Sequence, residues 1–161
     1  MAKRTAALVV AWTILLTGVA DAQEGPLWPC EVTVSIEDGP WRNSARGAVR
    51  QLDAATVISW RVVGVGEPAT VSIVWADLED PVTGLATSWA SETEYLKATV
   101  EVDQPDRRWV MYTLLHELGH VAGLDHNDEV SVMGGGEIPF RRFTAWDLEA
   151  LSDVTCTVTA R

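Results

Sequence analysis

The chain places all three of its histidines within the segment HELGHVAGLDH, from His116 to His126. His116 and His120 are four residues apart, so on a helix their imidazoles project from the same face, one turn apart. Two neutral imidazoles at this spacing can hold one zinc ion without bending the helix. Glu117 follows His116 directly and is well placed to act as a base beside the metal.

Gly123 allows the third histidine to reach the same ion, because glycine tolerates positive φ and lets the chain turn sharply at a helix end. His126 can then fold back and complete a site of three nitrogens. Three protein ligands leave one zinc position for water, which is typical of a catalytic site rather than a structural one. The metal would lower the pKa of that water to about 7. Glu117 would take its proton during attack on a peptide carbonyl.

The elements around this segment follow from hydrophobic spacing. Alternating apolar residues predict strands at 30–39, 57–63, 69–78 and 98–103, with a short polar strand at 85–90 as a plausible sheet edge. Helical spacing predicts helices at 41–56, from 105 to about 122, and from Thr144 onward, where Asp147 completes a capping box. This order predicts a single α/β (α+β) domain with a twisted, mostly parallel sheet.

The histidine segment resembles a known enzyme family. It matches, residue for residue, the metzincin zinc-protease motif H-E-x-x-H-x-x-G-x-x-H. Met133 lies in SVMG, seven residues past His126, and resembles the methionine of the family's Met-turn; a methionine filling a core gap is compatible with the same pattern. The residues GLDH and the short gap to Met133 look most like the matrixin branch. Asp147 resembles the aspartate that braces the Met-turn in that branch.

The resemblance covers roughly residues 30–154, although the specific motifs span only 116–133. It implies a zincin fold with an antiparallel edge strand, an active-site helix and a C-terminal helix. It implies one catalytic zinc ion held by His116, His120 and His126, a general base, and support from Gly123, Met133 and Asp147. The implied activity is secreted zinc-dependent endopeptidase activity, with Glu117 as that base.

The same resemblance implies how a substrate would bind. An extended peptide would add to the polar edge strand at 85–90 as a further strand. The segment after Met133, through Pro139 and Phe140, would wall the pocket for the side chain that follows the scissile bond.

Several residues depart from the family pattern. Asn127 follows the third histidine, where the named branches carry other residues, so the subfamily stays open. Gly134 and Gly135 follow Met133 in place of a tyrosine, so the zinc ion would stabilise the oxyanion with less help. No histidine remains for a second, structural zinc site. Three acidic residues of one loop could bind calcium, although such a loop is more often simply solvated: Asp77, Glu79 and Asp80.

The first 22 residues read as a signal peptide. Lys3 and Arg4 precede an apolar run from residue 6 to residue 20, and Ala20-Asp21-Ala22 offers a small-x-small cleavage site. The alternative is an uncleaved membrane anchor, which the shortness of the run and the small-residue exit disfavour. We therefore expect one catalytic domain from residue 23 to residue 161, secreted to the extracellular space or the periplasm, with no membrane attachment after cleavage.

Charge and cysteines limit the partners and the compartment. The net charge of −11 argues against nucleic acid and anionic membranes, and a soluble acidic surface explains it; support for basic substrates is weak. We expect a monomer that binds a protein or peptide substrate. Cys30 and Cys156 predict one disulfide joining the two ends of the domain, worth about 4–5 kcal/mol in the entropic model. The alternative is that Cys30 binds zinc as a thiolate and blocks the site.

Two other functions are compatible with the histidines. The first is a non-catalytic, zinc-stabilised extracellular binding protein of the same fold. Glu117 argues against it, because a site kept only for binding metal needs no base. The second is an exported structural domain whose histidines bind metal incidentally, which stoichiometric zinc in the purified protein would contradict.

Overall fold

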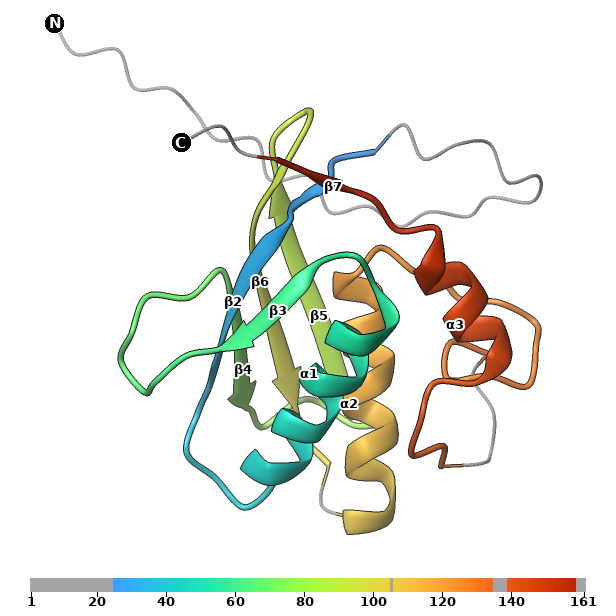
Figure 1. Cartoon of the computed structure of the whole chain (residues 1–161). Helices are drawn as coiled ribbons and strands as arrows, with labels where there is room; N and C mark the ends of the chain where they lie inside the picture. The colour runs from blue at the N-terminus through green and yellow to red at the C-terminus, as the bar shows by residue number, and fades with distance from the viewer. Residues whose placement is uncertain (1–24, 105, 135–138, 159–161) are drawn as a thin grey trace, which may run out of the picture.

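The computed structural model describes residues 25–104, 106–134 and 139–158 (Figure 1), so the predicted signal segment at 1–22 lies outside them. Five strands form the main sheet, in the order β3-β2-β4-β6-β5. These are β2 (Glu31–Ile36), β3 (Ser59–Val62), β4 (Val71–Trp75), β5 (Gly84–Ala90) and β6 (Tyr95–Val102). Neighbouring strands are parallel except β5, which runs antiparallel to β6 at one edge. The predicted mixed fold with a mostly parallel sheet is confirmed.

Three helices accompany the sheet: α1 (Arg42–Ala55), α2 (Arg107–Val121) and α3 (Ala145–Ser152). α1 and α2 lie side by side across the sheet in Figure 1, and both contact its strands. α2 packs on β5 and β6, whereas α1 packs on β2 and β3. Among the described residues, no helix is long and apolar enough to cross a membrane.

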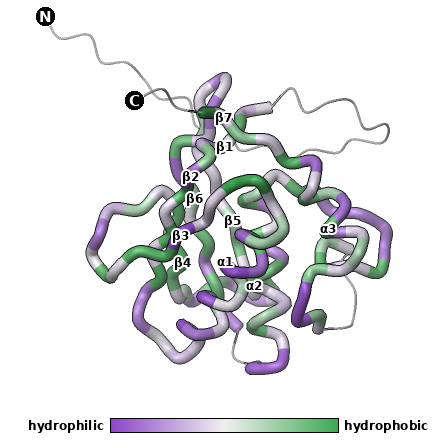
Figure 2. Tube along the Cα trace, in the orientation of Figure 1, coloured by the Kyte–Doolittle hydropathy of each residue, from purple (hydrophilic) through white to green (hydrophobic). Residues whose placement is uncertain are grey.

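The strands alternate between a core face and an open face, as a sheet covered on one side requires. Val34, Val71, Ile73 and Val100 are fully buried on the side of the helices. The residues between them on the open side include hydroxyl side chains at Ser35, Ser72 and Thr99. Figure 2 shows hydrophobic and hydrophilic positions mixed along these strands. The core therefore lies between the sheet and the two long helices.

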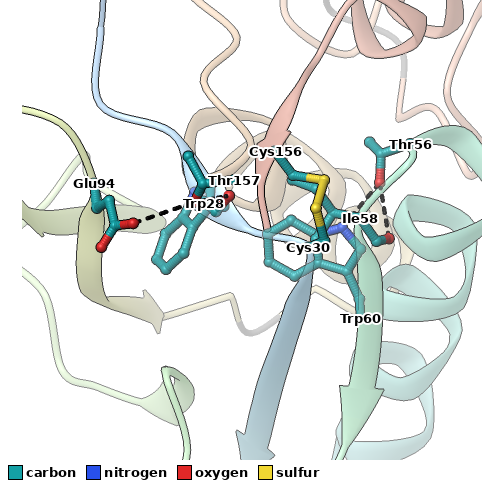
Figure 3. Close-up of a disulfide and its surroundings, with 8 residues drawn as sticks. All are labelled: Trp28, Cys30, Thr56, Ile58, Trp60, Glu94, Cys156 and Thr157. Carbon is teal, nitrogen blue, oxygen red and sulfur yellow. Dashed lines mark hydrogen bonds between the residues drawn. A yellow bond between two sulfur atoms is a disulfide. The ribbon is translucent and has the colours of Figure 1, made fainter. Parts of the chain in front are cut away.

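A second sheet of two short parallel strands joins the ends of the domain. β1 (Trp28–Pro29) pairs with β7 (Cys156–Thr157), and the predicted Cys30–Cys156 disulfide lies beside them (Figure 3). Cys30 is therefore not a free thiolate, which removes the alternative of a cysteine blocking the zinc site. Sequence periodicity did not predict these strands, because two residues are too few to show an alternation.

Trp28 connects this end of the molecule to α2. Its indole nitrogen donates a hydrogen bond of 2.6 Å to the carbonyl of Val121, the last residue of α2. The Trp28 ring also stacks on Tyr95 with 4.9 Å between ring centroids. The disulfide-linked end of the domain thus holds the C-terminal end of the helix that carries the histidine motif.

Element boundaries differ from the sequence prediction by a few residues. β6 begins at Tyr95 rather than 98, because Tyr95 and Leu96 are consecutive apolar residues and interrupt the alternation that predicts a strand. The helix starts are as predicted: the side chain of Asp106 caps α2, and Thr144 with Asp147 forms a capping box at α3.

Candidate metal centre

α2 presents the first two histidines on its less buried face. Leu114, Leu115 and Leu118 are fully buried in the core, whereas His116 and His120 are half-buried. The four-residue spacing places the two imidazoles one turn apart, edge to face, with 4.8 Å between ring centroids. The helix therefore uses its apolar residues for packing and leaves both rings accessible.

The helix ends in a turn that brings in the third histidine. Gly123 has φ +97°, in the left-handed region that favours glycine. The amide of Leu124 donates to the carbonyl of Gly119 at 2.9 Å, which closes the turn. His126 follows this turn and lies beside the other two rings. The conformation that the sequence predicted for Gly123 is present.

The three Nε2 atoms converge on one point. His116 and His126 are 3.1 Å apart at Nε2, and His120 lies 3.2 Å from each of the others. Three imidazole nitrogens bound to one tetrahedral zinc ion at about 2.0–2.1 Å would be about 3.3–3.4 Å apart, so this triangle fits the ion closely. Among the described residues, these histidines are the one group of three or more potential ligands gathered within 4.8 Å.

Backbone carbonyls fix two of the imidazoles in the ligand tautomer. Nδ1 of His116 lies 2.8 Å from the carbonyl of Val132, and Nδ1 of His120 lies 2.9 Å from that of Leu124. Because a carbonyl can only accept, each Nδ1 carries the proton and each neutral Nε2 presents a lone pair. Two lone pairs that face each other at 3.2 Å repel unless a cation lies between them, so the donor set fits a metal ion. Burial lowers the pKa of both histidines, which favours the neutral form.

Glu117 lies between α2 and β5, with only 7% of its surface exposed. Burial raises the pKa of its carboxyl to about 7, although a hydrogen bond from the backbone N–H of Ala86 acts in the opposite direction. A carboxyl poised near neutral pH is suited to accept and release a proton. A cation bound to the histidines would favour the carboxylate and lower this pKa.

Gly84 positions that carboxylate and was not singled out from the sequence. A methyl group built on Gly84 would lie 2.7 Å from Oε1 of Glu117 and 2.6 Å from Cγ2 of Thr113. No side chain therefore fits where β5 begins against α2. The available signal was a glycine at a strand position, which often marks a close approach of another segment.

Met133 packs under the histidines against α2. It is 1% exposed, and a methyl group built on Gly119 would lie 2.5 Å from its sulfur. Gly119 stands between His116 and His120 in the motif, so the absence of a side chain there makes room for the methionine. Met133 thus lies against the turn of α2 that carries the two helical histidines.

Asp147 ties α3 to the turn around Met133. Its carboxylate accepts hydrogen bonds from the amides of Val132 at 3.1 Å and Met133 at 3.3 Å, and from both the amide and the hydroxyl of Thr144. Val132 in turn offers its carbonyl to His116. A continuous path of hydrogen bonds therefore runs from the C-terminal helix to a proposed metal ligand.

Asn127, which departs from the family pattern, organises the loop between the third histidine and the methionine. Its backbone N–H donates to the carbonyl of Met133 at 3.2 Å. Its side-chain oxygen accepts from the backbone N–H of Glu129 at 3.0 Å and from the hydroxyl of Ser131 at 2.9 Å. Gly134 closes the loop so tightly that a methyl group on it would overlap the carbonyl of Glu129. Asn127 therefore holds the two ends of this loop together through its backbone and its side chain.

Tyr112 is a further residue of the site that sequence reasoning missed. It precedes His116 by one helical turn, and the two ring centroids are 5.8 Å apart. It also packs edge-on against Trp109. The signal in the sequence was the repeated four-residue spacing of positions 112, 116 and 120.

The structure brings other predicted residues together only in part. Phe140 packs against the core, whereas residues 135–138 of the predicted pocket wall lie outside the described residues. Asp77, Glu79 and Asp80 form no second group of potential metal ligands within the described chain. The acidic loop therefore remains what its sequence favoured, a solvated loop for which calcium binding has no support.

The comparisons with known proteins leave the interpretation of this centre to its geometry. The centre contains three converging imidazoles, a buried glutamate beside them, and a methionine turn held by an aspartate. No protein-family model matches this chain, and a search of curated proteins finds no match.

Proposed function

We propose that this chain is a zinc-dependent endopeptidase of the metzincin type, most similar to the matrixin branch. The observation that carries the proposal is the convergence of three Nε2 atoms within 3.1–3.2 Å, next to a buried glutamate on the same helix. A structural zinc site takes four protein ligands, whereas this group offers three histidines and an adjacent base.

The proposed roles follow from the positions of the side chains. His116, His120 and His126 hold zinc through Nε2, and their Nδ1 hydrogen bonds keep two of the rings oriented. When bound, zinc supplies a cation that makes water nucleophilic near neutral pH and polarises a carbonyl. The Glu117 carboxylate accepts the proton of the attacking water and passes it to the departing amine nitrogen.

The free edge of β5 is the proposed binding surface for substrate. The N–H of Ala86 points to Glu117 rather than to β6, so it lies on the outer edge of β5. Because backbone groups alternate in direction along an antiparallel strand, those of Ser88 also point away from β6. A peptide added along this edge would pass beside the three histidines.

The decisive experiment is digestion of a mixed peptide library by the zinc-loaded protein and by its Glu117→Ala variant. We expect cleavage by the first, and loss of cleavage by the second with zinc stoichiometry unchanged. Glu149→Ala, at an exposed glutamate of α3, is the matched control and should cleave normally. Bound zinc without cleavage in all three proteins would refute the endopeptidase proposal and favour a zinc-stabilised binding protein.

We also propose that the protein acts outside the cytoplasm, in the extracellular space or the periplasm. The apolar segment before residue 23 and the Cys30–Cys156 disulfide support this, because disulfides persist in oxidising compartments. Mass spectrometry of the exported protein should find Gln23 at its N-terminus. A retained segment 1–22 would instead indicate a membrane anchor.

A further inference from the structure

An open surface cavity of about 550 Å³ lies between α1 and β3, on the edge of the sheet opposite β5. These two elements lie next to each other at the front of Figure 1. Arg46 and Arg50 line the cavity from α1. Arg61 lines it from the edge of β3, where strand alternation turns its side chain to the open face of the sheet, away from α1. Because Glu117 packs against β5, this cavity is separate from the proposed metal centre.

The charge of the cavity is opposite to that of the chain. The chain carries 23 acidic and 12 basic side chains, yet three exposed arginines surround this one space. None of the three has an ion pair with a described residue. Asp53 is the one acidic residue lining the cavity, and its carboxylate already accepts the amide of Trp60. A hydrogen bond from a neutral amide leaves the Asp53 carboxylate charged, so three arginines and one aspartate give the lining a net charge of +2.

The shape and floor of the cavity favour a peptide among anionic ligands. Val49 and Trp60 are buried beneath the cavity, whereas half-buried Val62 offers an apolar contact at its surface. β3 is an edge strand: Ser59 and Val63 donate their amides to β2, at 2.9 Å in each case. The alternation of a strand therefore turns the amide of Val62 outward, towards an added chain.

We propose that this cavity binds an acidic segment of a protein partner, extended along the edge of β3, with its carboxylates paired to Arg46 and Arg50. Arginine is suited to this role because its planar guanidinium binds a carboxylate through two parallel hydrogen bonds. The proposal is independent of the activity of the metal centre, since it requires neither zinc nor catalysis.

The test is fluorescence anisotropy with a labelled eight-residue peptide that alternates glutamate and valine. Two matched peptides carry glutamine or lysine in place of glutamate. The protein is the full chain with Glu117→Ala, so that no peptide is degraded. We expect the glutamate peptide to bind about tenfold more tightly than the glutamine peptide, with weaker binding at high salt, and the lysine peptide not to bind. Hydrogen exchange should show protection of the Val62 amide on binding.

A pair of double variants separates a specific site from a general charge effect. Arg46→Ala with Arg50→Ala should weaken binding of the glutamate peptide about tenfold. Lys97→Ala with Arg107→Ala removes the same charge from exposed positions elsewhere and should change binding less than about twofold.

Four outcomes would overturn the proposal. They are equal losses in the two double variants, equal binding of the glutamate and glutamine peptides, no binding, and binding that leaves the Val62 amide unprotected.

Displacement of the peptide by a sulfated oligosaccharide at lower concentration would assign the arginines to a polysaccharide instead. Self-association of the protein that the Arg46→Ala/Arg50→Ala variant abolishes would assign the cavity to a second copy of the chain.

Discussion

At the scale of single residues, burial determines how Glu117 responds to pH. The folded-state pKa of about 7 lies above the usual 4.5, so the metal-free folded protein retains a proton that the unfolded chain releases between these values. The folded state of the metal-free protein therefore loses stability as pH rises from 4.5 to about 7. The loss is on the order of 3 kcal/mol if the full shift is expressed.

Glu117→Gln removes this titration and provides the measurement. We expect the metal-free variant and the metal-free parent to have similar free energies of unfolding near pH 4.5. At pH 8 the variant should be more stable by about 3 kcal/mol, as measured by denaturant titration. A difference that does not change between these pH values would show that Glu117 ionises in the fold without penalty.

Gly84 provides the second prediction at this scale. Gly84→Ala places a methyl group against Oε1 of Glu117 and Cγ2 of Thr113, so the Glu117 carboxylate should be displaced. We expect kcat to fall at least about tenfold, with KM little changed and zinc content intact, because a displaced catalytic group is costly even for small shifts. Gly25→Ala, where no atom lies within 4 Å, is the control. Unchanged kcat would show that the helix and strand separate without consequence.

At the scale of elements, α3 supports the metal centre through Asp147, which is 1% exposed. Asp147→Ala leaves the amides of Val132 and Met133 without their acceptor, at a cost of about 2–4 kcal/mol in the free energy of unfolding. Zinc affinity should fall about 10- to 100-fold, because Val132 positions His116. Chelator competition measures the affinity, and Glu149→Ala in the same helix is the control. Equal zinc affinity in both variants would contradict this coupling.

The elements also show what could be predicted from sequence. α2 and the strands around it follow from periodicity, and Gly123 follows from the need for a turn before His126. Gly84 could not be predicted in the same way, because its contact with Glu117 joins segments that only tertiary packing brings together. The role of Asn127 also depends on the folded loop: its partners Glu129 and Ser131 carry no spacing signal.

At the scale of the whole molecule, the disulfide joins the two ends of the domain across a sequence separation of 126 residues. Replacing both cysteines with serine should lower the free energy of unfolding by about 2–5 kcal/mol, because the unfolded chain regains the freedom that the closed loop removes. Thermal and denaturant unfolding of the double variant beside the oxidised parent measure this difference. Equal stability would show that β1, β7 and the Trp28 contacts alone secure this end.

The gathering of the three histidines makes the stability of the protein depend on the zinc concentration around it. Because native histidines are gathered and unfolded ones are not, zinc bound only to the native state adds RT ln(1 + [Zn]/Kd) to its stability, about 2.7 kcal/mol at a hundredfold excess over Kd. If the chain is the proposed endopeptidase, scarcity of zinc both silences a molecule and makes it open more often. Molecules that still hold metal would then digest those that have lost it, so the concentration of enzyme would follow the supply of zinc through self-digestion.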